Sequence, residues 1–340
     1  MGEFDLIARY FTRPTRRAAL GVGDDCALLS PGPGMQLAIS SDMLVEGRHF
    51  FADADPEELG HKALAVNLSD LAASGAQPLA FTLALALPEA DEAWLAAFAR
   101  GLFALADAHG CELIGGDTTR GPLNICITVL GEVAQGDALR RGGAQAGDEV
   151  WVSGAPGQAR LALGALRGEW PLADAVLAAV RPRLERPTPR VALGRALRGL
   201  ATSCIDVSDG LLGDLAHVLD ASRVGASVEA DTASRLIAAS ANGPDASAAF
   251  DPDALTPRQR RQCALAGGDD YELLFTAPVK RHAQVLAAAA RAGVRATRIG
   301  RIELAPGVRV RDAQGQTLAG PFASFDHFAS THAPRAHSRP

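Results

Sequence analysis

The fold is decided by residues 80–114, AFTLALALPEADEAWLAAFARGLFALADAHGCELI. The apolar run at 80–87 has the length of a strand, whereas residues 91–109 carry apolar side chains at helical spacing. Asp91 is a typical N-cap for that helix and Gly110 is a typical stop signal. A second strand is expected directly after Gly110, so the stretch predicts strand, helix and strand in succession. The core face of the predicted helix consists of Trp94, Phe98, Leu102 and Leu105.

The same alternation of strands and helices continues on both sides of this stretch. Glycine and polar residues cluster at 135–147, and the pattern then starts again. We therefore predict an α/β protein of two domains, residues 1–138 and 139–330, followed by a disordered tail at 331–340. The further elements expected are helices at 3–11 and 56–74, strands at 36–41, 123–133, 149–153 and 203–207, helices near Ala159, Val191 and Ser208, and an irregular insertion at 232–257.

Composition excludes several classes of protein. The chain has 340 residues, of which 48% are hydrophobic and 21% charged, so it can bury a substantial core. No apolar run approaches the roughly 20 residues that a bilayer-spanning helix requires, and the N-terminus is acidic and amphipathic, so we expect no membrane association and a cytoplasmic location. The five scattered cysteines favour buried thiols over disulfides or a zinc site.

The charge balance narrows the choice further. The formal net charge is -6, which argues against a protein that binds nucleic acid through a basic surface. Lysine occurs only at positions 62 and 280, and neither follows a glycine. The GxxxxGK[ST] phosphate loop is therefore absent.

Aspartates recur beside glycine or small hydroxyl residues at the ends of the predicted elements. A single segment of this kind is more often a turn or a helix cap than a binding site. On the predicted helix at 56–74, Asn67, Asp70 and Ser74 should form one polar stripe. The acidic segments are Gly23-Asp-Asp25, Ser40-Ser-Asp42, Asn67-Leu-Ser-Asp70, Gly115-Gly-Asp-Thr-Thr-Arg120, Asp206-Val-Ser-Asp-Gly210 and Gly267-Gly-Asp-Asp-Tyr-Glu272.

Turn chemistry alone does not explain why aspartate returns in nearly every one of these segments. Converging carboxylates repel one another, and a hard cation such as Mg²⁺ relieves that repulsion with oxygen ligands. Two phosphorylated substrates repel each other in the same way, at about 1 kcal/mol for each pair of charges 4 Å apart in water. The pattern therefore predicts a Mg²⁺-dependent transfer of a phosphoryl group from ATP to a small phosphorylated acceptor.

Other residues of these segments suit phosphate binding. The Gly115-Gly116 and Gly267-Gly268 pairs allow backbone N–H groups to approach phosphate oxygens. Arg120 and Arg141 can pair with phosphate through the planar guanidinium, although surface arginines are common in this chain. His49 is a candidate contact for the acceptor, and its alternative role is structural. No arrangement for a covalent nucleophile is evident, and direct transfer to a phosphate oxygen needs none.

These segments, together with Ser41-Asp-Met-Leu-Val-Glu-Gly-Arg-His-Phe50 and His61-Lys-Ala-Leu-Ala-Val-Asn-Leu-Ser-Asp-Leu-Ala-Ala-Ser-Gly75, resemble the bacterial thiamine-monophosphate kinase family of the aminoimidazole-ribonucleotide-synthetase-like superfamily. The resemblance runs in family order from about residue 3 to 328. It implies conversion of thiamine monophosphate to thiamine diphosphate by direct in-line transfer from ATP, with several Mg²⁺ ions. It also implies a homodimer that forms through strands of the N-terminal domain, and a C-terminal domain that closes over ATP.

The resemblance also assigns roles to individual residues. Asp42, Asp70 and Asp209 are the expected catalytic carboxylates. The expected Mg²⁺ ligands are Asp25, Ser40, Ser41, Asp42, Asp70, Asp117, Asp206 and Asp209. The expected ATP contacts are Gly116, Asp117, Arg141 and Ser208, and the expected acceptor contacts are His49, Asp269 and Phe325, of which Phe325 would lie against the thiamine ring.

Two positions depart from the family pattern. Asp269 stands where glutamate is common, which shortens the reach of that carboxylate by one methylene. Met43 stands where threonine is common. Neither change removes a charge.

Two other functions stay open on the sequence alone. An ATP-dependent synthetase or ligase of the same superfamily shares the acidic, glycine-rich layout, but it would release inorganic phosphate. A non-catalytic module that binds Mg²⁺ and nucleotide would show no turnover at all.

Overall fold

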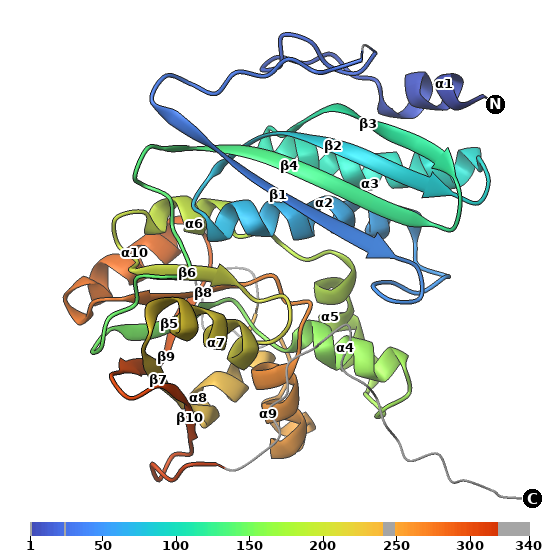
Figure 1. Cartoon of the computed structure of the whole chain (residues 1–340). Helices are drawn as coiled ribbons and strands as arrows, with labels where there is room; N and C mark the ends of the chain where they lie inside the picture. Colours follow the sequence, from blue (N-terminus) through green and yellow to red (C-terminus); the bar gives the residue numbers. More distant parts are fainter. Residues whose placement is uncertain (1, 24, 241–248, 319–340) are drawn as a thin grey trace, which may run out of the picture.

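The computed structural model describes residues 2–23, 25–240 and 249–318. The predicted tail at 331–340 and Phe325 therefore lie outside the described residues. The chain forms two sheets, each with helices packed against it (Figure 1). This confirms the predicted α/β class.

The first sheet has the strand order β1-β4-β2-β3. Its strands are β1 (Met35–Val45), β2 (Gln77–Leu87), β3 (Glu112–Arg120) and β4 (Asn124–Ala134). β2 and β3 are parallel and are connected by α3 (Glu92–His109), which confirms the predicted succession of strand, helix and strand. Asp91 caps α3 by accepting from the backbone N–H groups of Ala93 and Trp94, and Gly110 ends it in the left-handed conformation. A helical turn, α1 (Glu3–Leu6), continues into a π-helical turn at Ile7–Phe11.

Helix α2 (Pro56–Ala73) lies between the first sheet and the second half of the chain. It packs against β1 and β4 on one side and against α6 and β6 on the other. This position explains why its apolar side chains surround the helix axis, with Leu59, Leu64, Val66, Leu68 and Leu71 all buried. One continuous hydrophobic core includes residues of both sheets, such as Phe81 and Phe275.

The second sheet has the strand order β10-β7-β9-β5-β8-β6 and is antiparallel except for the β7–β10 pair. Side chains alternate between its faces: Trp151 and Phe275 face the core that contains α2, whereas Val150 and Leu274 pack with α7. The strands are β5 (Glu149–Ser153), β6 (Ser203–Asp206), β7 (Gly225–Glu229), β8 (Leu273–Ala277), β9 (Ala296–Glu303) and β10 (Gly307–Arg311). The helices are α4 (Gln158–Leu166), α5 (Asp174–Glu185), α6 (Val191–Leu197), α7 (Leu211–Ser222), α8 (Ala230–Arg235), α9 (Pro257–Ala266) and α10 (His282–Arg291).

Several boundaries differ from the prediction. β3 continues through Gly115-Gly116 to Arg120, although the sequence predicts that this strand ends at 114. Its pairing with β2 keeps the glycines in the sheet, with a register shift beside Thr82. The helix expected from Ser208 begins at Leu211, and α8 occupies part of the expected irregular insertion.

The cysteines mostly follow the prediction. All five are free, and Cys111, Cys204 and Cys263 are buried, but Cys26 is exposed. Within the described part of the chain, no helix has the length and apolar character needed to cross a membrane.

Candidate active site

Carboxylates from both sheets meet at helix α2. Ser40 and Asp42 alternate with Ser41 along β1, so their side chains face α2 while that of Ser41 faces away. The Ser40 hydroxyl donates to Asp70 Oδ2 at 2.5 Å, and the Asp42 backbone N–H donates to Asn67 Oδ1 at 3.1 Å. Both contacts confirm that Asn67 and Asp70 share one stripe of α2.

The residue before Asp70 makes the connection to the second sheet. The Ser69 hydroxyl donates to Asp206 Oδ2 at 2.7 Å, and Asp206 ends strand β6. Ser69 and Asp70 are adjacent on α2, so this helix contacts β1 of the first sheet and the end of β6 in the second sheet. We call Asp42, Asp70, Asp206 and Asp209 the acidic cluster.

Burial and mutual repulsion disfavour the charged forms of carboxylates in the acidic cluster. Burial, with the charges of Asp70 and Asp209, raises the pKa of Asp42 to about 6. Burial, with the charges of Asp70, Asp214 and Asp42, raises the pKa of Asp206 to about 7. Burial also raises the pKa of Asp70, although the Ser40 hydrogen bond and the Arg141 charge oppose that effect. Carboxylates in this condition favour a bound cation, whose charge would return them to the ionised form.

Asp209 lies in a turn that a further carboxylate organises. The backbone N–H groups of Ser208, Asp209 and Gly210 all donate to Asp214 Oδ2, at 3.1, 3.2 and 3.1 Å. Asp214 is buried on the first turns of α7. Sequence reasoning missed Asp214, whose only signal is its position four residues after Gly210.

In the segment Gly267–Glu272, side chains buried in the protein interior alternate with side chains that face the site. Asp270 accepts from the Gly157 N–H at 2.6 Å at the start of α4, and Glu272 accepts from Arg183 and Arg190. Asp269 and Tyr271, which alternate with these two residues along the chain, adopt the left-handed conformation, with φ of 66° and 50°. Such a backbone is uncommon for residues other than glycine, and residues held in strained conformations cluster at functional sites.

Asp269 and Tyr271 connect this segment to the rest of the site. The Tyr271 hydroxyl donates to Asp269 Oδ1 at 3.1 Å, and Lys62 Nζ lies 3.4 Å from the same oxygen. Burial and the charges of Asp269, Asp42 and Asp206 raise the pKa of Tyr271 well above its ordinary value. Tyr271 therefore lies near both Asp269 and the acidic cluster.

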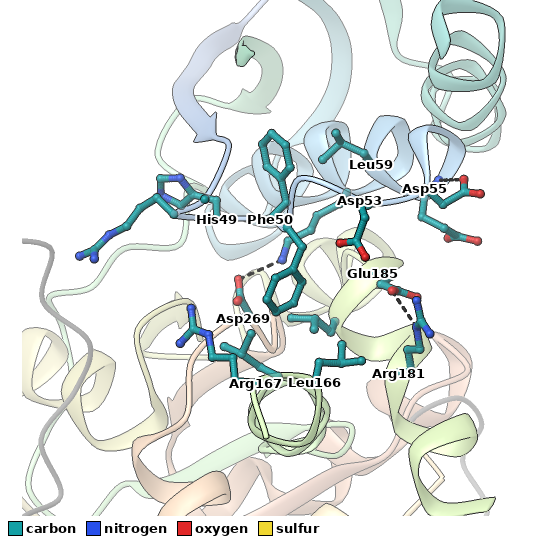
Figure 2. A pocket seen from close by; sticks show the side chains of 18 residues that line it. His49, Phe50, Asp53, Asp55, Leu59, Leu166, Arg167, Arg181, Glu185 and Asp269 are labelled. Atoms are coloured by element: carbon teal, nitrogen blue, oxygen red, sulfur yellow. Dashed lines mark hydrogen bonds and ion pairs between the residues drawn. The ribbon is translucent and has the colours of Figure 1, made fainter. Parts of the chain in front are cut away.

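A pocket next to Asp269 lies between the loop after β1, the start of α2, and helices α4 and α5 (Figure 2). His49 and Phe50 line it on one side, and Leu166 and Arg167 on the other. The Val45 backbone N–H donates to His49 Nδ1 at 2.9 Å, which leaves Nε2 as the proton-bearing nitrogen of the neutral ring. The structure thus brings His49 and Asp269 together at one pocket.

Four other predicted residues lie away from the acidic cluster within one chain. Gly116 and Asp117 are exposed on β3, three strands from β1, which is about 14 Å at the usual strand spacing. Asp117 pairs with Ala84, which is exposed between buried neighbours, so Asp117 lies on the outward face of the sheet. The Ser41 hydroxyl is on that face too, 3.0 Å from Thr128 Oγ1. Asp25 is exposed in the segment before β1.

The remaining predicted residues lie close to the acidic cluster. Arg141 is near enough to Asp70 to oppose the rise of its pKa. Ser208 and Asp209 are half-buried beside Asp206, and the Ser208 carbonyl accepts from the Asp269 N–H at 2.8 Å. Sequence reasoning missed Lys62, Ser69 and Tyr271, although each lies within a quoted segment.

Oxygen ligands dominate this arrangement, and their chemistry fits Mg²⁺. Among the described residues, no group of three or more His, Cys, Asp or Glu side chains encloses a metal position. Mg²⁺ commonly uses only one or two carboxylates and completes its shell with water and substrate phosphates. The acidic cluster therefore fits an ion that binds together with phosphates better than an ion in a protein cage.

Comparison with known proteins gives the family. Residues 23–133 match the N-terminal domain of AIR synthase related proteins and residues 145–313 match their C-terminal domain, so the chain belongs to that family. Within it, the chain is 44% identical over 341 residues to the thiamine-monophosphate kinase of Escherichia coli strain K12, covering 97% of this chain and 99% of that protein. The chain is thus a member of the thiamine-monophosphate kinase family.

Solved structures agree with this assignment. A thiamine-monophosphate kinase from Stenotrophomonas maltophilia K279a superimposes with a TM-score of 0.79 at 44% identity, over 93% of this chain and 96% of that chain. The structure of AaThiL complexed with AMPPCP and TMP gives a TM-score of 0.72 at 28% identity, over 88% of this chain and 89% of that chain.

The raised pKa of Asp206 predicts how stability depends on pH. In the folded protein Asp206 keeps its proton until the pH reaches its pKa of about 7, whereas in an unfolded chain the carboxyl loses the proton near its ordinary pKa of 3.8. Protonation of Asp206 stabilises the folded state fully below pH 3.8, and this stabilisation is lost as the pH rises through 7. In EDTA at pH 8, Asp206→Asn should therefore be more stable than wild type by at least about 1 kcal/mol, because one pKa unit is about 1.4 kcal/mol.

Urea unfolding at pH 8 and pH 5 measures this difference. The difference in unfolding free energy between Asp206→Asn and wild type should be smaller at pH 5 than at pH 8. Mg²⁺ should also reduce this difference at pH 8, because it should stabilise the wild type alone. An Asp206→Asn protein that is less stable than wild type at pH 8 in EDTA would contradict the account.

Proposed function

We propose that this protein transfers the γ-phosphoryl group of ATP to thiamine monophosphate, giving ADP and thiamine diphosphate. The supporting observation is that an acidic cluster suited to phosphate-bound cations adjoins the pocket of His49, Phe50 and Asp269. The relatives that carry the kinase name match almost the whole chain, and AaThiL has been solved with AMPPCP and TMP bound. The competing synthetase reading lacks comparable support.

The chemistry of the pocket suits a flat cationic ring. Phe50 and Phe51 supply aromatic surfaces, which attract a cation through the ring quadrupole. Asp53 supplies negative charge beside them, whereas Glu58 and Asp269 are paired with Arg186 and Lys62. The thiazolium ring of thiamine carries one positive charge and fits this lining.

We infer that Mg²⁺ binds at the acidic cluster, with Asp42, Asp70, Asp206 and Asp209 as its protein ligands. When bound, the ions neutralise the phosphates and stabilise charge on the transferred group. The contribution of the chain is to hold the ligands in place: Ser40 orients Asp70, and Ser69 orients Asp206. Asn67 fixes the backbone at Asp42.

An in-line transfer needs no general base from the protein. The acceptor atom is an oxygen of a phosphate that is ionised at neutral pH, so no proton has to leave it. The chain contributes by binding and orienting the acceptor in the pocket. Arg141 and the turn at Ser208 remain the predicted ATP contacts near the cluster.

We propose that the chain forms a homodimer through the outward face of the first sheet. β1 is an edge strand, and its outward side chains Leu37, Ile39 and Met43 are 40%, 61% and 53% exposed. A long, flat, apolar edge strand is a ready site for pairing. In such a dimer Ser41 and Asp117 face the second copy, which is where their predicted roles in binding Mg²⁺ and ATP would be fulfilled.

Ile39→Lys is expected to convert the dimer into a monomer, because a charge would be buried in the apolar face. Light scattering after gel filtration measures the mass. Leu304→Lys is the matched control and should stay dimeric, since Leu304 is 82% exposed in the connection between β9 and β10, away from the first sheet. A monomeric wild type, or an unchanged mass in Ile39→Lys, would refute this interface.

The proposed reaction is tested by its products. Purified protein with ATP, Mg²⁺ and thiamine monophosphate should form thiamine diphosphate and ADP in equal amounts, and free thiamine should not be phosphorylated. Release of inorganic phosphate in place of thiamine diphosphate would favour a ligase, and no turnover would favour a binding module. The cytoplasmic location remains a prediction from the sequence.

A further inference from the structure

Lys62 occupies an unusual position for a lysine. It lies in the second turn of α2, at the boundary between the two halves of the chain, and is only 4% exposed. The other lysine, Lys280, is exposed in the turn Val279–Arg281. Burying an ammonium group costs several kcal/mol unless it is paired and hydrogen-bonded.

The protein satisfies this ammonium only in part. Its charged partner is Asp269, with Nζ 3.4 Å from Oδ1, which is longer than the 2.7–2.9 Å usual for a charge-assisted hydrogen bond. Figure 2 draws this ion pair at Asp269. An ammonium has three donors, and within the described parts of the chain the Lys62 side chain makes no other hydrogen bond or ion pair. Because Lys62 lines the pocket, its remaining donors can reach a ligand there.

The ion pair lies where the pocket meets the acidic cluster. Asp269 also accepts from the Tyr271 hydroxyl, and the Tyr271 N–H donates to the Val207 carbonyl at 2.8 Å, directly after Asp206. On the other side, Lys62 shares α2 with Asp70, eight residues or about 12 Å along the helix axis. A ligand with its ring in the pocket would thus place a phosphate group between Lys62 and the acidic cluster.

We propose that the Lys62 ammonium binds the phosphate of the acceptor and makes the site select a phosphorylated acceptor over the free alcohol. The proposal rests on the proposed function and extends it to a residue that determines specificity. Asp269 is the positioning residue: it holds the ammonium at the mouth of the pocket before the acceptor binds. A compact lysine charge suits one oxygen of a phosphate whose other oxygens contact metal ions.

Binding measured without ATP tests the proposal. In isothermal titration calorimetry, Lys62→Met should bind thiamine monophosphate about 10- to 100-fold more weakly than wild type does, which corresponds to the loss of one strong charge-assisted contact. Thiamine lacks the phosphate, so its affinity should change less than about threefold. Lys62→Arg should recover part of the loss, and Lys280→Met is the matched control that should bind as wild type does. Equal losses for both ligands, or no loss for the phosphate ester, would overturn the proposal.

A second measurement does not depend on the folding of a variant. Protein labelled with ¹³C at the lysine ε-carbon gives one signal from each of the two lysines, and Lys280→Arg assigns them. Saturating thiamine monophosphate should shift the Lys62 signal, whereas thiamine should shift it far less. A Lys62 signal that responds equally to the two ligands would contradict phosphate binding.

Kinetics separate this inference from the proposed function. If wild type makes no thiamine diphosphate, the proposed function fails. If wild type makes it and Lys62→Met keeps the same KM for thiamine monophosphate, only the assignment of Lys62 fails.

Discussion

Asp70→Asn is expected to fold normally and to lose at least about 100-fold in kcat/KM, because Asp70 is the carboxylate at which both sheets meet the proposed metal site. Its Oδ2 accepts from Ser40 at 2.5 Å, and its neighbour Ser69 contacts Asp206. Asparagine keeps the size and the hydrogen bond but removes the negative charge. Burial raises the pKa of Asp70, so loss of that charge should not destabilise the metal-free protein.

Steady-state kinetics at several Mg²⁺ concentrations measure the effect. Asp107→Asn is the matched control, because Asp107 is exposed at the end of α3 and pairs with Arg13 at the surface. The control should keep wild-type kinetics. Near-normal turnover of Asp70→Asn would remove Asp70 from the metal site.

Arg190→Met is expected to destabilise the protein by about 3–5 kcal/mol, the usual cost of breaking a buried ion pair from one side. Glu272 is 1% exposed and accepts from Arg190 at 2.6 and 2.5 Å, from Arg183 at 3.0 Å and from Ser153 at 2.5 Å. Burial alone would raise the pKa of Glu272, but the two arginines outweigh it and hold the pKa below its ordinary value. Without Arg190, the buried Glu272 carboxylate loses one of the two arginines that pair with it in the described part of the chain.

The unfolding midpoint in urea measures this loss. Arg309→Met is the matched control: Arg309 pairs with Glu303 at 3.0 Å on the surface, and such pairs contribute about 1 kcal/mol or less. Because Glu272 anchors the segment that carries Asp269, Arg190→Met should also weaken binding of thiamine monophosphate. Equal stability of the Arg190 and Arg309 variants would show that the buried cluster does not hold this segment.

Local signals account for the parts of the fold that the sequence predicts well. Helix α3 has a capping aspartate, an apolar stripe and a terminal glycine, and each signal acts within a few residues. The course of β3 beyond residue 114 could not be predicted in this way. Two glycines suggest a loop, but pairing with β2 keeps Gly115 and Gly116 in the sheet.

The same contrast between local signals and long-range contacts applies to the candidate site. Residue types identified the aspartates and the polar stripe of α2, because one helix face is visible in the sequence. The separation of Ser40 from Ser41 follows from strand alternation, which matters only once β1 is known to be a strand through both residues. The contact between Lys62 and Asp269 joins residues more than 200 positions apart, and no local pattern reveals it.

The fate of the γ-phosphoryl group tests the central claim most directly. Wild-type protein is incubated with γ-³²P-labelled ATP, Mg²⁺ and thiamine monophosphate, and the products are separated. We expect the label to appear in thiamine diphosphate in an amount equal to the ADP formed, and we expect EDTA to abolish the transfer. Label recovered as inorganic phosphate, with thiamine monophosphate unchanged, would contradict the central claim.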